Sequence, residues 1–282
     1  RVIGDPSKFG LNAKVLQIDI DPAEINKNIP AFKSVVGDIK YILSKLIPLV
    51  KENKRKEWIS QIAAWKKEYP SIYDKNPKNS VNPKHICEII NKVAGENTII
   101  TTEVGQHQMW TAQFYPFTKP RTFLTSGGLG TMGYGTGAAM GAQIGNPKKR
   151  VVHIAGDGSF RMNCNELATI AHYNLPLVIV IFNNHALGNV RMWQRLFYGK
   201  RFSQTTLDFG PDWCKLADAY GIKGYKADNA KDFEKVFEKA FKAKAPAIID
   251  VEVDIDEMIL PMVPGGKPIY DMIMSLSEEV MS

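Results

Sequence analysis

Two apolar runs in the middle of the chain each end in polar residues that suit a cation. Residues 151–155 lead into the turn sequence Gly156-Asp157-Gly158. Residues 177–182 lead into Asn183-Asn184. A carboxylate and an amide oxygen suit Mg²⁺, which prefers hard oxygen ligands and usually shares them with a phosphate. Asp157 and Asn184 are therefore candidate metal ligands, and the glycines beside Asp157 would let the backbone approach a bulky anion closely.

These two sites can meet only if a strand, a helix and a second, parallel strand bring them together. We expect strands at 151–155 and 177–182, and the segment between them fits one helix. The carboxyl ends of parallel strands meet at one edge of a sheet, where ligands bind in α/β folds. A strand expected at 97–102 ends shortly before His107, which predicts this histidine at the same edge. Taken alone, each feature also fits an ordinary turn, a helix cap or a structural histidine.

The remaining segments alternate between strand and helix patterns, which predicts an α/β fold. We expect a doubly wound, mostly parallel sheet that is covered on both faces. Further helices are expected at 39–50, 84–93, 106–115, 187–197, 212–220 and 230–242, and further strands at 14–20 and 247–253.

Four regions are expected along the chain. Residues 1–50 are predicted to be the tail of a second α/β domain of the nucleotide-binding type. Residues 51–83 are predicted to form a helical linker, and its last part, 70–83, is rich in proline and asparagine. Residues 84–260 would then form the catalytic domain. Residues 261–282 would be a C-terminal tail over the active site.

Composition narrows the class of protein. Hydrophobic residues make up 44% of the 282 residues, enough for a packed core, and no apolar run approaches the ~18 residues of a membrane span. The three cysteines are far apart and lack metal-binding spacing, as in a reduced cytoplasmic protein. The net charge of +7 is spread over helical segments, which favours a solvated basic face over a nucleic-acid site. Because the chain begins at Arg1, we expect it to be part of a longer product.

A glycine motif offers an alternative cofactor. Gly128-Leu-Gly130-Thr-Met-Gly133 matches the GxGxxG pattern of dinucleotide-binding proteins. Residues 121–126 make a poor strand before it, and His153 stands where an acidic ribose ligand is expected. We therefore favour the start of a closely packed, glycine-rich helix. No GxSxG, HExxH or P-loop sequence occurs, so serine hydrolase, zinc protease and Walker-type nucleotide hydrolase readings have no support.

The sequence from Gly156-Asp157-Gly158 to Asn183-Asn184 resembles the cofactor motif of thiamine diphosphate-dependent enzymes, in which GDG is followed by NN after a fixed interval. Neighbouring sequences narrow the resemblance to the large catalytic subunit of acetolactate synthase (acetohydroxyacid synthase), over essentially the whole chain. They are TEVGQHQMWTAQFYPF at 102–117, TSGGLGTMGYG at 125–135, LGNVRMWQRLFYGKRFSQTTLDFGPD at 187–212 and LPMVPGG at 260–266. QIDIDPAEINKN at 17–28 and VVGD at 35–38 resemble the end of that family's central, FAD-binding domain.

The resemblance implies roles for individual residues. Asp157 and Asn184 would bind Mg²⁺ together with the backbone carbonyl of Ala186. Met132 would act as a wedge that folds the cofactor, and Gly130 would also meet the aminopyrimidine ring. The diphosphate would lie against Val104, Gly105, Gln106, His107, Gly158 and Ser159. The substrate channel would be lined by Val190, Arg191 and Trp193, and FAD would be contacted from Asp19 to Asp38.

Two positions bear on substrate choice. Trp193 would favour 2-oxobutyrate as second substrate by packing on its extra methyl group, an effect of roughly 1–3 kcal/mol at most. The family usually has methionine where this chain has Asn189, a departure that changes part of the apolar pocket. His185 also replaces a residue that is commonly glutamine or glutamate in the family.

The implied activity is that of a transferase in branched-chain amino acid biosynthesis. With thiamine diphosphate and Mg²⁺, it decarboxylates pyruvate and condenses the remainder with a second pyruvate or 2-oxobutyrate. The resemblance implies FAD in the full-length protein, a homodimer or homotetramer formed through the catalytic domain, and a regulatory small subunit as a further partner. The family's activating glutamate lies in an N-terminal domain outside these residues, so we expect this chain alone to make no acetolactate. The alternatives are a related thiamine diphosphate-dependent decarboxylase or oxidase of 2-oxo acids, and a non-catalytic cofactor-binding fragment.

Overall fold

The computed structural model describes residues 3–69 and 79–275, which fall into two compact units. One unit contains residues 3–69 and 260–275, and the other contains residues 79–259. Part of the predicted linker, 70–78, and the end of the predicted tail, 276–282, lie outside the described residues. The predicted domain limits therefore stay predictions. Among the described helices, none is long and apolar enough to cross a membrane.

The smaller unit contains a parallel pair of strands, β1 (Leu16–Asp19) and β2 (Lys33–Val36), in which Asp19 lies opposite Val36. The carboxylate of Asp38 caps the next helix by accepting the N–H of Tyr41 at 2.8 Å. Helices follow at α1 (Ile39–Leu46) and α2 (Lys56–Glu68), with short 3₁₀ turns at η1 (Pro6–Lys8), η2 (Pro22–Glu24), η3 (Ile47–Leu49) and η6 (Ile269–Asp271). The helix expected at 39–50 thus ends earlier, because Pro48 lies in a separate 3₁₀ turn.

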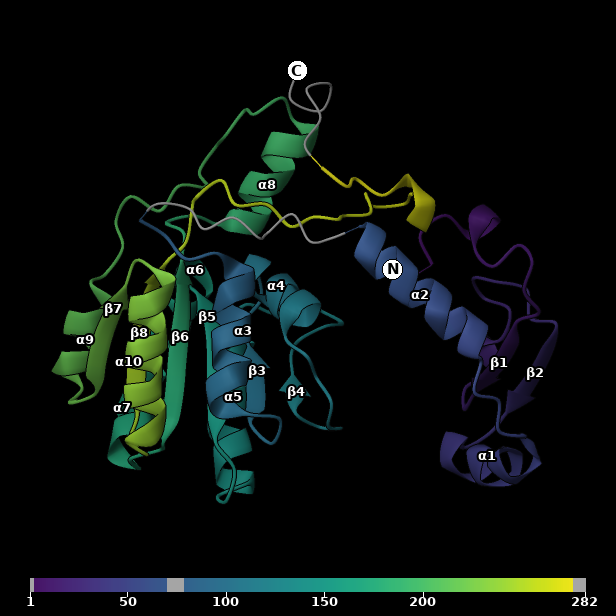
Figure 1. Cartoon of the computed structure of the whole chain (residues 1–282), viewed down its shortest axis with the longest axis horizontal. Helices are drawn as coiled ribbons and strands as arrows, with labels where there is room; N and C mark the ends of the chain where they lie inside the picture. The colour runs from purple at the N-terminus through teal and green to yellow at the C-terminus, as the bar shows by residue number, and fades with distance from the viewer. Residues whose placement is uncertain (1–2, 70–78, 276–282) are drawn as a thin grey trace. The chain divides into compact units, whose positions relative to one another are not determined.

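The larger unit is built on a six-stranded parallel sheet in the order β4-β3-β5-β6-β8-β7 (Figure 1). Every residue of β5 and β6 is buried, as expected for parallel strands covered on both faces. The strands are β3 (Ile99–Thr102), β4 (Phe123–Leu124), β5 (Val151–Gly156), β6 (Leu177–Asn183), β7 (Lys223–Ala227) and β8 (Ala247–Glu252).

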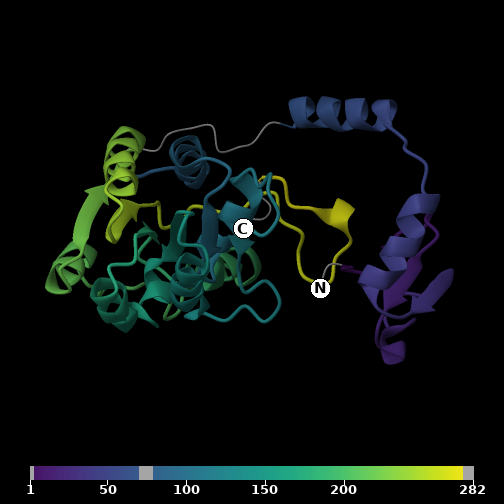
Figure 2. The same cartoon turned by 90° about the horizontal axis from the view of Figure 1, so that it is seen from below.

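Helices pack on both faces of this sheet, which confirms the α/β fold class. Its helices are α3 (Pro83–Ala94), α4 (Gln106–Phe114), α5 (Tyr134–Gly145), α6 (Asp157–Phe160), α7 (Leu167–His172), α8 (Gly188–Phe197), α9 (Trp213–Ala219) and α10 (Ala230–Lys242). Helix α3 packs against α4 and α10, and Figure 2 shows α3 and α10 together on one side of the sheet. On the other face, buried residues of α5, α7 and α9 form one apolar core with the strands, including Phe160 and Trp213.

The order of the strands predicts where a ligand binds. After β3 the chain passes to β4 at one edge, and after β5 it passes to β6 on the opposite side. The connections therefore diverge between β3 and β5. In open α/β sheets this divergence opens a crevice at the carboxyl ends of the two strands, where ligands bind.

Two sequence-based expectations were wrong in detail. The segment between β5 and β6 is not one helix but α6, a 3₁₀ turn η5 (Cys164–Glu166) and α7. Helix α6 ends at Phe160, and the side-chain amide of Asn163, just before η5, donates to the carbonyl of Gly133. Residues 121–126, expected to make a poor strand, contain only the two-residue β4. Strand β7 was not expected, because its sequence Lys-Gly-Tyr-Lys-Ala has little apolar character and it lies at the sheet edge.

Candidate functional site

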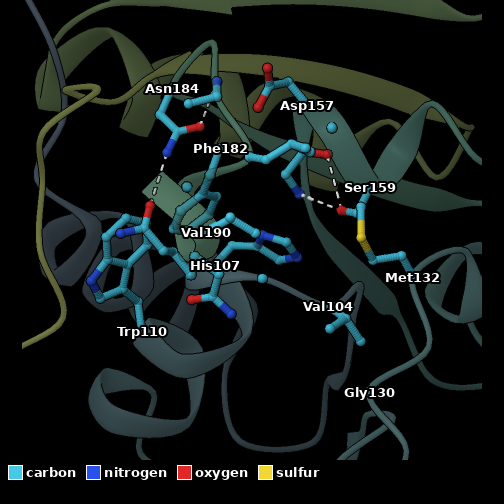
Figure 3. Close-up of a pocket in the computed structure, with 18 of the residues that line it drawn as sticks. Val104, His107, Trp110, Gly130, Met132, Asp157, Ser159, Phe182, Asn184 and Val190 are labelled. Carbon is cyan, nitrogen blue, oxygen red and sulfur yellow. Dashed lines mark hydrogen bonds between the residues drawn. The ribbon is translucent and has the colours of Figure 1, made fainter. Parts of the chain in front are cut away.

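A cavity of about 210 Å³ lies at the carboxyl ends of β3, β5 and β6, where the connections diverge (Figure 3). It is lined by residues that are far apart in the sequence: Val104, Gly105, Gln106, His107, Trp110, Gly130, Met132, Gly156, Asp157, Gly158, Ser159, Phe182, Asn184, Ala186, Leu187, Gly188, Asn189, Val190 and Trp193. All three predicted metal ligands are among them. So are all the predicted diphosphate and aminopyrimidine contacts.

Asp157 is the acidic side chain of this cavity. It begins α6 directly after β5 and is only 2% exposed. Burial raises the pKa of its carboxyl group to about 6, although His185 and Arg161 act in the opposite direction. A buried carboxylate is costly unless a cation or hydrogen bonds compensate its charge. The position therefore suits a bound cation.

The orientation of the Asn184 amide is fixed by its neighbours. Its Nδ2 donates to Oε1 of Gln106 at 3.0 Å, and its Oδ1 accepts the backbone N–H of Ala186 at 3.2 Å (Figure 3). Gln106 is in turn held by a 2.9 Å bond from its Nε2 to the carbonyl of Glu257. The amide nitrogen of Asn184 thus faces Gln106, and the amide oxygen faces away from Gln106.

Two glycines of the cavity wall stand where a side chain would clash with its neighbours. A Cβ atom on Gly158 would lie 2.8 Å from Leu187 Cδ2. A Cβ atom on Gly188 would lie 2.0 Å from Oε1 of Gln106 and 2.6 Å from Nδ2 of Asn184. At these two positions the wall is therefore backbone, which a bulky anion can approach closely.

His107 and Ser159 complete this part of the wall. Burial, and then the neighbouring His153, lower the pKa of His107 to about 3, so its ring is neutral at physiological pH. Its Nε2 has no hydrogen-bond partner within the described part of the chain. Ser159 Oγ accepts the N–H of Gly156 at 3.2 Å and caps α6. A neutral imidazole carries one N–H, so Nε2 would donate to a phosphate oxygen in the tautomer that gives up the backbone hydrogen bond at Glu103.

The glycine motif at 128–133 contributes Gly130 and Met132 to the cavity but does not form a dinucleotide site. The start of α5 is occupied by the buried carboxylate of Glu103, which accepts the N–H groups of Gly133 and Gly135 at 2.7 Å each. An anion of the protein itself therefore fills the place where a dinucleotide-binding helix holds its phosphate. This contact is the physical reason why the motif match is incidental.

Helix α8 provides the outer wall. Val190 and Trp193 line the cavity and remain 41% and 45% exposed. Asn189 also lines it, and the Oδ1 atom of Asn189 is buried without a hydrogen-bond partner among the described residues. Arg191 does not line the cavity: it pairs with Asp256 at 3.0 Å, and its guanidinium lies 3.9 Å from the centre of the Phe202 ring. Its predicted place in the substrate channel stays a prediction.

Sequence reasoning missed two large aromatic residues of the wall. Trp110 is 1% exposed, stacks on Phe182 with ring centres 6.3 Å apart, and donates from Nε1 to the carbonyl of Met258 at 3.2 Å. Trp110 follows Gln106 by four residues and His107 by three on α4, a spacing that could have placed it on the same helix face. No comparable signal marks Phe182, which looks like any other residue of a buried strand.

Asp19 and Asp38, the predicted FAD contacts, lie in the smaller unit at the carboxyl ends of β1 and β2. The carbonyl of Asp19 accepts the N–H of Gly37 at 2.9 Å, and Asp38 is engaged as a helix cap. Their contact with FAD stays a prediction.

The donor set fits a hard divalent cation that is shared with a phosphate. Asp157 and Asn184 point into the same part of the cavity (Figure 3), and Ala186 lies beside them in its wall. A carboxylate, an amide oxygen and a backbone carbonyl are the oxygen ligands that Mg²⁺ accepts, and a diphosphate supplies further oxygens. The protein residues alone are too few for a closed metal cage: the described residues contain no group of three or more His, Cys, Asp or Glu side chains that could hold an ion.

Comparison with known proteins agrees with this geometry. Residues 103–251, more than half of the chain, match the family described as thiamine pyrophosphate enzyme, C-terminal TPP binding domain. The matched segment begins directly after β3 and ends in β8, so it contains every residue that lines the cavity.

The chain is also similar to proteins named as acetolactate synthases. It is 42% identical over 99% of its length to a probable acetolactate synthase large subunit of Methanococcus aeolicus, covering 49% of that protein. It is 41% identical to the acetolactate synthase large subunit of Porphyra purpurea, covering 47% of it. It is 40% identical to the mitochondrial acetolactate synthase catalytic subunit of Saccharomyces cerevisiae, covering 42% of it. The chain thus spans about half the length of these relatives.

Proposed function

Because the chain belongs to the thiamine pyrophosphate enzyme family, we propose that it forms the cofactor-binding half of an acetolactate synthase. The activity would be decarboxylation of pyruvate and transfer of the remaining two-carbon unit to a second pyruvate or to 2-oxobutyrate. The observation that carries this proposal is the position of Asp157 and Asn184 at the divergence of the sheet connections, within residues that match the family. The similarity to named acetolactate synthases narrows the reaction.

Asp157, Asn184 and the carbonyl of Ala186 would hold Mg²⁺. The backbone of Gly105 and Gly158 and the side chains of His107 and Ser159 would hold the diphosphate, which shares the ion. When bound, thiamine diphosphate supplies the group that stabilises the carbanion left when a 2-oxo acid loses CO₂. The chain contributes binding, orientation and a dry environment.

Electrostatics favour this assignment of residues. Without an ion, Asp157 carries an expensive buried charge; an ion with a diphosphate would balance it. His107 stays neutral, so it adds no charge to the site. Trp110 and Phe182 are buried behind the cavity and exclude water from its inner wall. Exclusion of water strengthens each of these electrostatic interactions.

The second substrate would enter along α8. Trp193 and Val190 offer apolar surface to the alkyl group of a 2-oxo acid, and both are accessible from outside. An additional methyl group packed on Trp193 is worth roughly 1–3 kcal/mol, enough for a preference for 2-oxobutyrate but not for exclusive use of it.

Further parts of the proposal concern the full-length protein. FAD binding from Asp19 to Asp38, a homodimer or homotetramer, a regulatory small subunit and a cytoplasmic location are proposed from the resemblance alone. The names of the relatives describe large or catalytic subunits, which agrees with a protein that has subunit partners.

An acetolactate assay of the full-length protein tests the proposal. With pyruvate, thiamine diphosphate and Mg²⁺, we expect acetolactate, and with added 2-oxobutyrate the mixed product as well. The matched control is Asp157→Ala in the same protein, which should make neither. Release of CO₂ with acetaldehyde but no acetolactate would instead identify a related decarboxylase. Absence of any pyruvate consumption by a protein that binds the cofactor would contradict the proposal.

A further inference from the structure

The loop that carries Met132 into the cavity is held by residues that do not themselves line it. Met132 stands between Thr131 and Gly133, and both neighbours are fixed by side chains from elsewhere. The N–H of Thr131 donates to Oγ of Ser126 at 3.0 Å. The N–H of Gly133 donates to Oε2 of Glu103 at 2.7 Å.

Glu103 binds the loop and the start of α5 together. Its second oxygen, Oε1, accepts the N–H groups of Gly135 at 2.7 Å and Thr136 at 3.3 Å. Its side chain is fully buried, with 0% exposure. Glu103 directly follows β3 and precedes Val104, so its backbone leads into the diphosphate side of the cavity while its side chain binds the Met132 side.

Asn163 holds the same residue from the opposite direction. Its Nδ2 donates to the carbonyl of Gly133, so the N–H and the C=O of one glycine are both bound by side chains. Gly133 has a φ of +90°, which favours glycine, and a Cβ atom there would lie 3.3 Å from Met162 Cβ. The backbone directly after Met132 is thus fixed in one unusual conformation.

Packing prevents α5 from taking up a different position. A Cβ atom on Gly135 would lie 2.7 Å from both the N of Glu103 and the carbonyl O of Thr102, so the helix rests directly on the backbone of β3. A shift of Glu103 would therefore move the start of α5 and the loop together. In contrast, Leu129 on the far side of the loop is 84% exposed, so that end has little support of its own.

We propose that Glu103 and Asn163 are positioning residues that clamp Gly133 and thereby hold Met132 against the ring portion of the cofactor, without contributing to the diphosphate portion. This inference rests on the proposed function, because it assigns Met132 to the thiamine ring. It goes further in naming the side chains that set the conformation of the wedge. Glu103 does so with charge-assisted hydrogen bonds, which are roughly twice as strong as neutral ones.

Binding of two ligands distinguishes the proposed clamp from a general structural role of Glu103. Inorganic diphosphate with Mg²⁺ occupies only the diphosphate portion, whereas thiamine diphosphate with Mg²⁺ occupies both portions. Calorimetric titration of the full-length protein gives the affinity for each. In Glu103→Gln we expect the affinity for thiamine diphosphate to fall roughly ten- to a hundred-fold, the range found when outer partners of a binding site are removed. The affinity for Mg²⁺ and inorganic diphosphate should stay within about twofold of wild type.

Two further variants make the test independent of a folding defect in one of them. Asn163→Ala removes the second hold on Gly133 and should give the same pattern. Met132→Ala should lower the affinity for thiamine diphosphate by itself, and adding Glu103→Gln to it should cost little more, because both changes act through one side chain. Additive losses in the double variant would show that Glu103 does not act through Met132.

The remaining outcomes decide the inference in the same way. An equal fall in both affinities would show that Glu103 supports the whole site, and no fall in either would show that it positions nothing; each overturns the clamp. In either case the proposed function still stands if the wild-type protein binds thiamine diphosphate. A wild-type protein that does not bind thiamine diphosphate overturns both proposals.

Discussion

Replacing Asp157 with asparagine should stabilise the cofactor-free protein while it destroys the metal site. The carboxyl group is 2% exposed, and burial raises its pKa from 3.8 to about 6. This difference of roughly two pKa units corresponds to about 3 kcal/mol of destabilisation at neutral pH, at about 1.36 kcal/mol per unit. Asparagine has the same shape and carries no charge, so it avoids this cost.

The effect has a defined dependence on pH. A carboxyl group whose pKa is raised by folding favours the folded state when it is protonated, and this stability is lost as the pH rises from 3.8 to about 6. Wild type and Asp157→Asn should therefore be about equally stable at pH 3.5 and differ most above pH 6. For a unit of this size, about 3 kcal/mol corresponds to roughly 6–12 °C in melting temperature.

Differential scanning calorimetry in EDTA measures this difference directly. Asp250→Asn is the matched control: Asp250 is also a buried carboxylate, but it accepts a 2.9 Å hydrogen bond from Asn183 and lies outside the cavity. With thiamine diphosphate and Mg²⁺, wild type and the control should gain stability, and Asp157→Asn should not. If Asp157→Asn is no more stable than wild type at pH 7.5 in EDTA, the buried charge does not carry the assigned cost. An equal gain at pH 3.5 would contradict the reasoning as well.

Three other substitutions test separate parts of the site. Gly188→Ala should abolish Mg²⁺-dependent cofactor binding, because its Cβ atom would lie 2.0 Å from Gln106 Oε1; Gly141→Ala, which meets open space, is the control, and calorimetric titration decides. Gln106→Met should weaken Mn²⁺ binding in the presence of thiamine diphosphate by roughly 10–100-fold, measured by electron paramagnetic resonance, because the Asn184 amide loses its partner; unchanged binding would show that this bond does not orient the ligand. Asn189→Met removes an unpaired buried amide oxygen and should raise the preference for 2-oxobutyrate over pyruvate by up to about tenfold in a competition assay with the full-length protein. An unaltered product ratio would remove Asn189 from the substrate pocket.

The residues proposed for the metal and the diphosphate could be placed together from sequence because they follow strand ends. Asp157 and Asn184 stand next to apolar runs, and the parallel arrangement of β5 and β6 places such ends on one edge. His107 follows from the same rule applied to β3. These residues depend on local patterns and on one topological rule, both of which the sequence carries.

Other features depend on contacts between distant segments. The side chain of Asn163 bonds to Gly133, 30 positions earlier, and no local signal reveals that bond. The role of Glu103 at the start of α5 likewise needs the three-dimensional approach of helix and strand. Phe182 lines the cavity and stacks there on Trp110, which comes from a distant helix. Arg191 was assigned to the channel by resemblance, and its ion pair with Asp256 is another such distant contact.

The decisive experiment is a crystal structure of the protein grown with Mg²⁺ and thiamine diphosphate. We expect one ion bound by Asp157, Asn184 and the carbonyl of Ala186, with the diphosphate over Gly158 and Ser159 and the cofactor ring against Met132. An ion held by other residues, or a cofactor bound away from the ends of β3 and β5, would contradict this expectation.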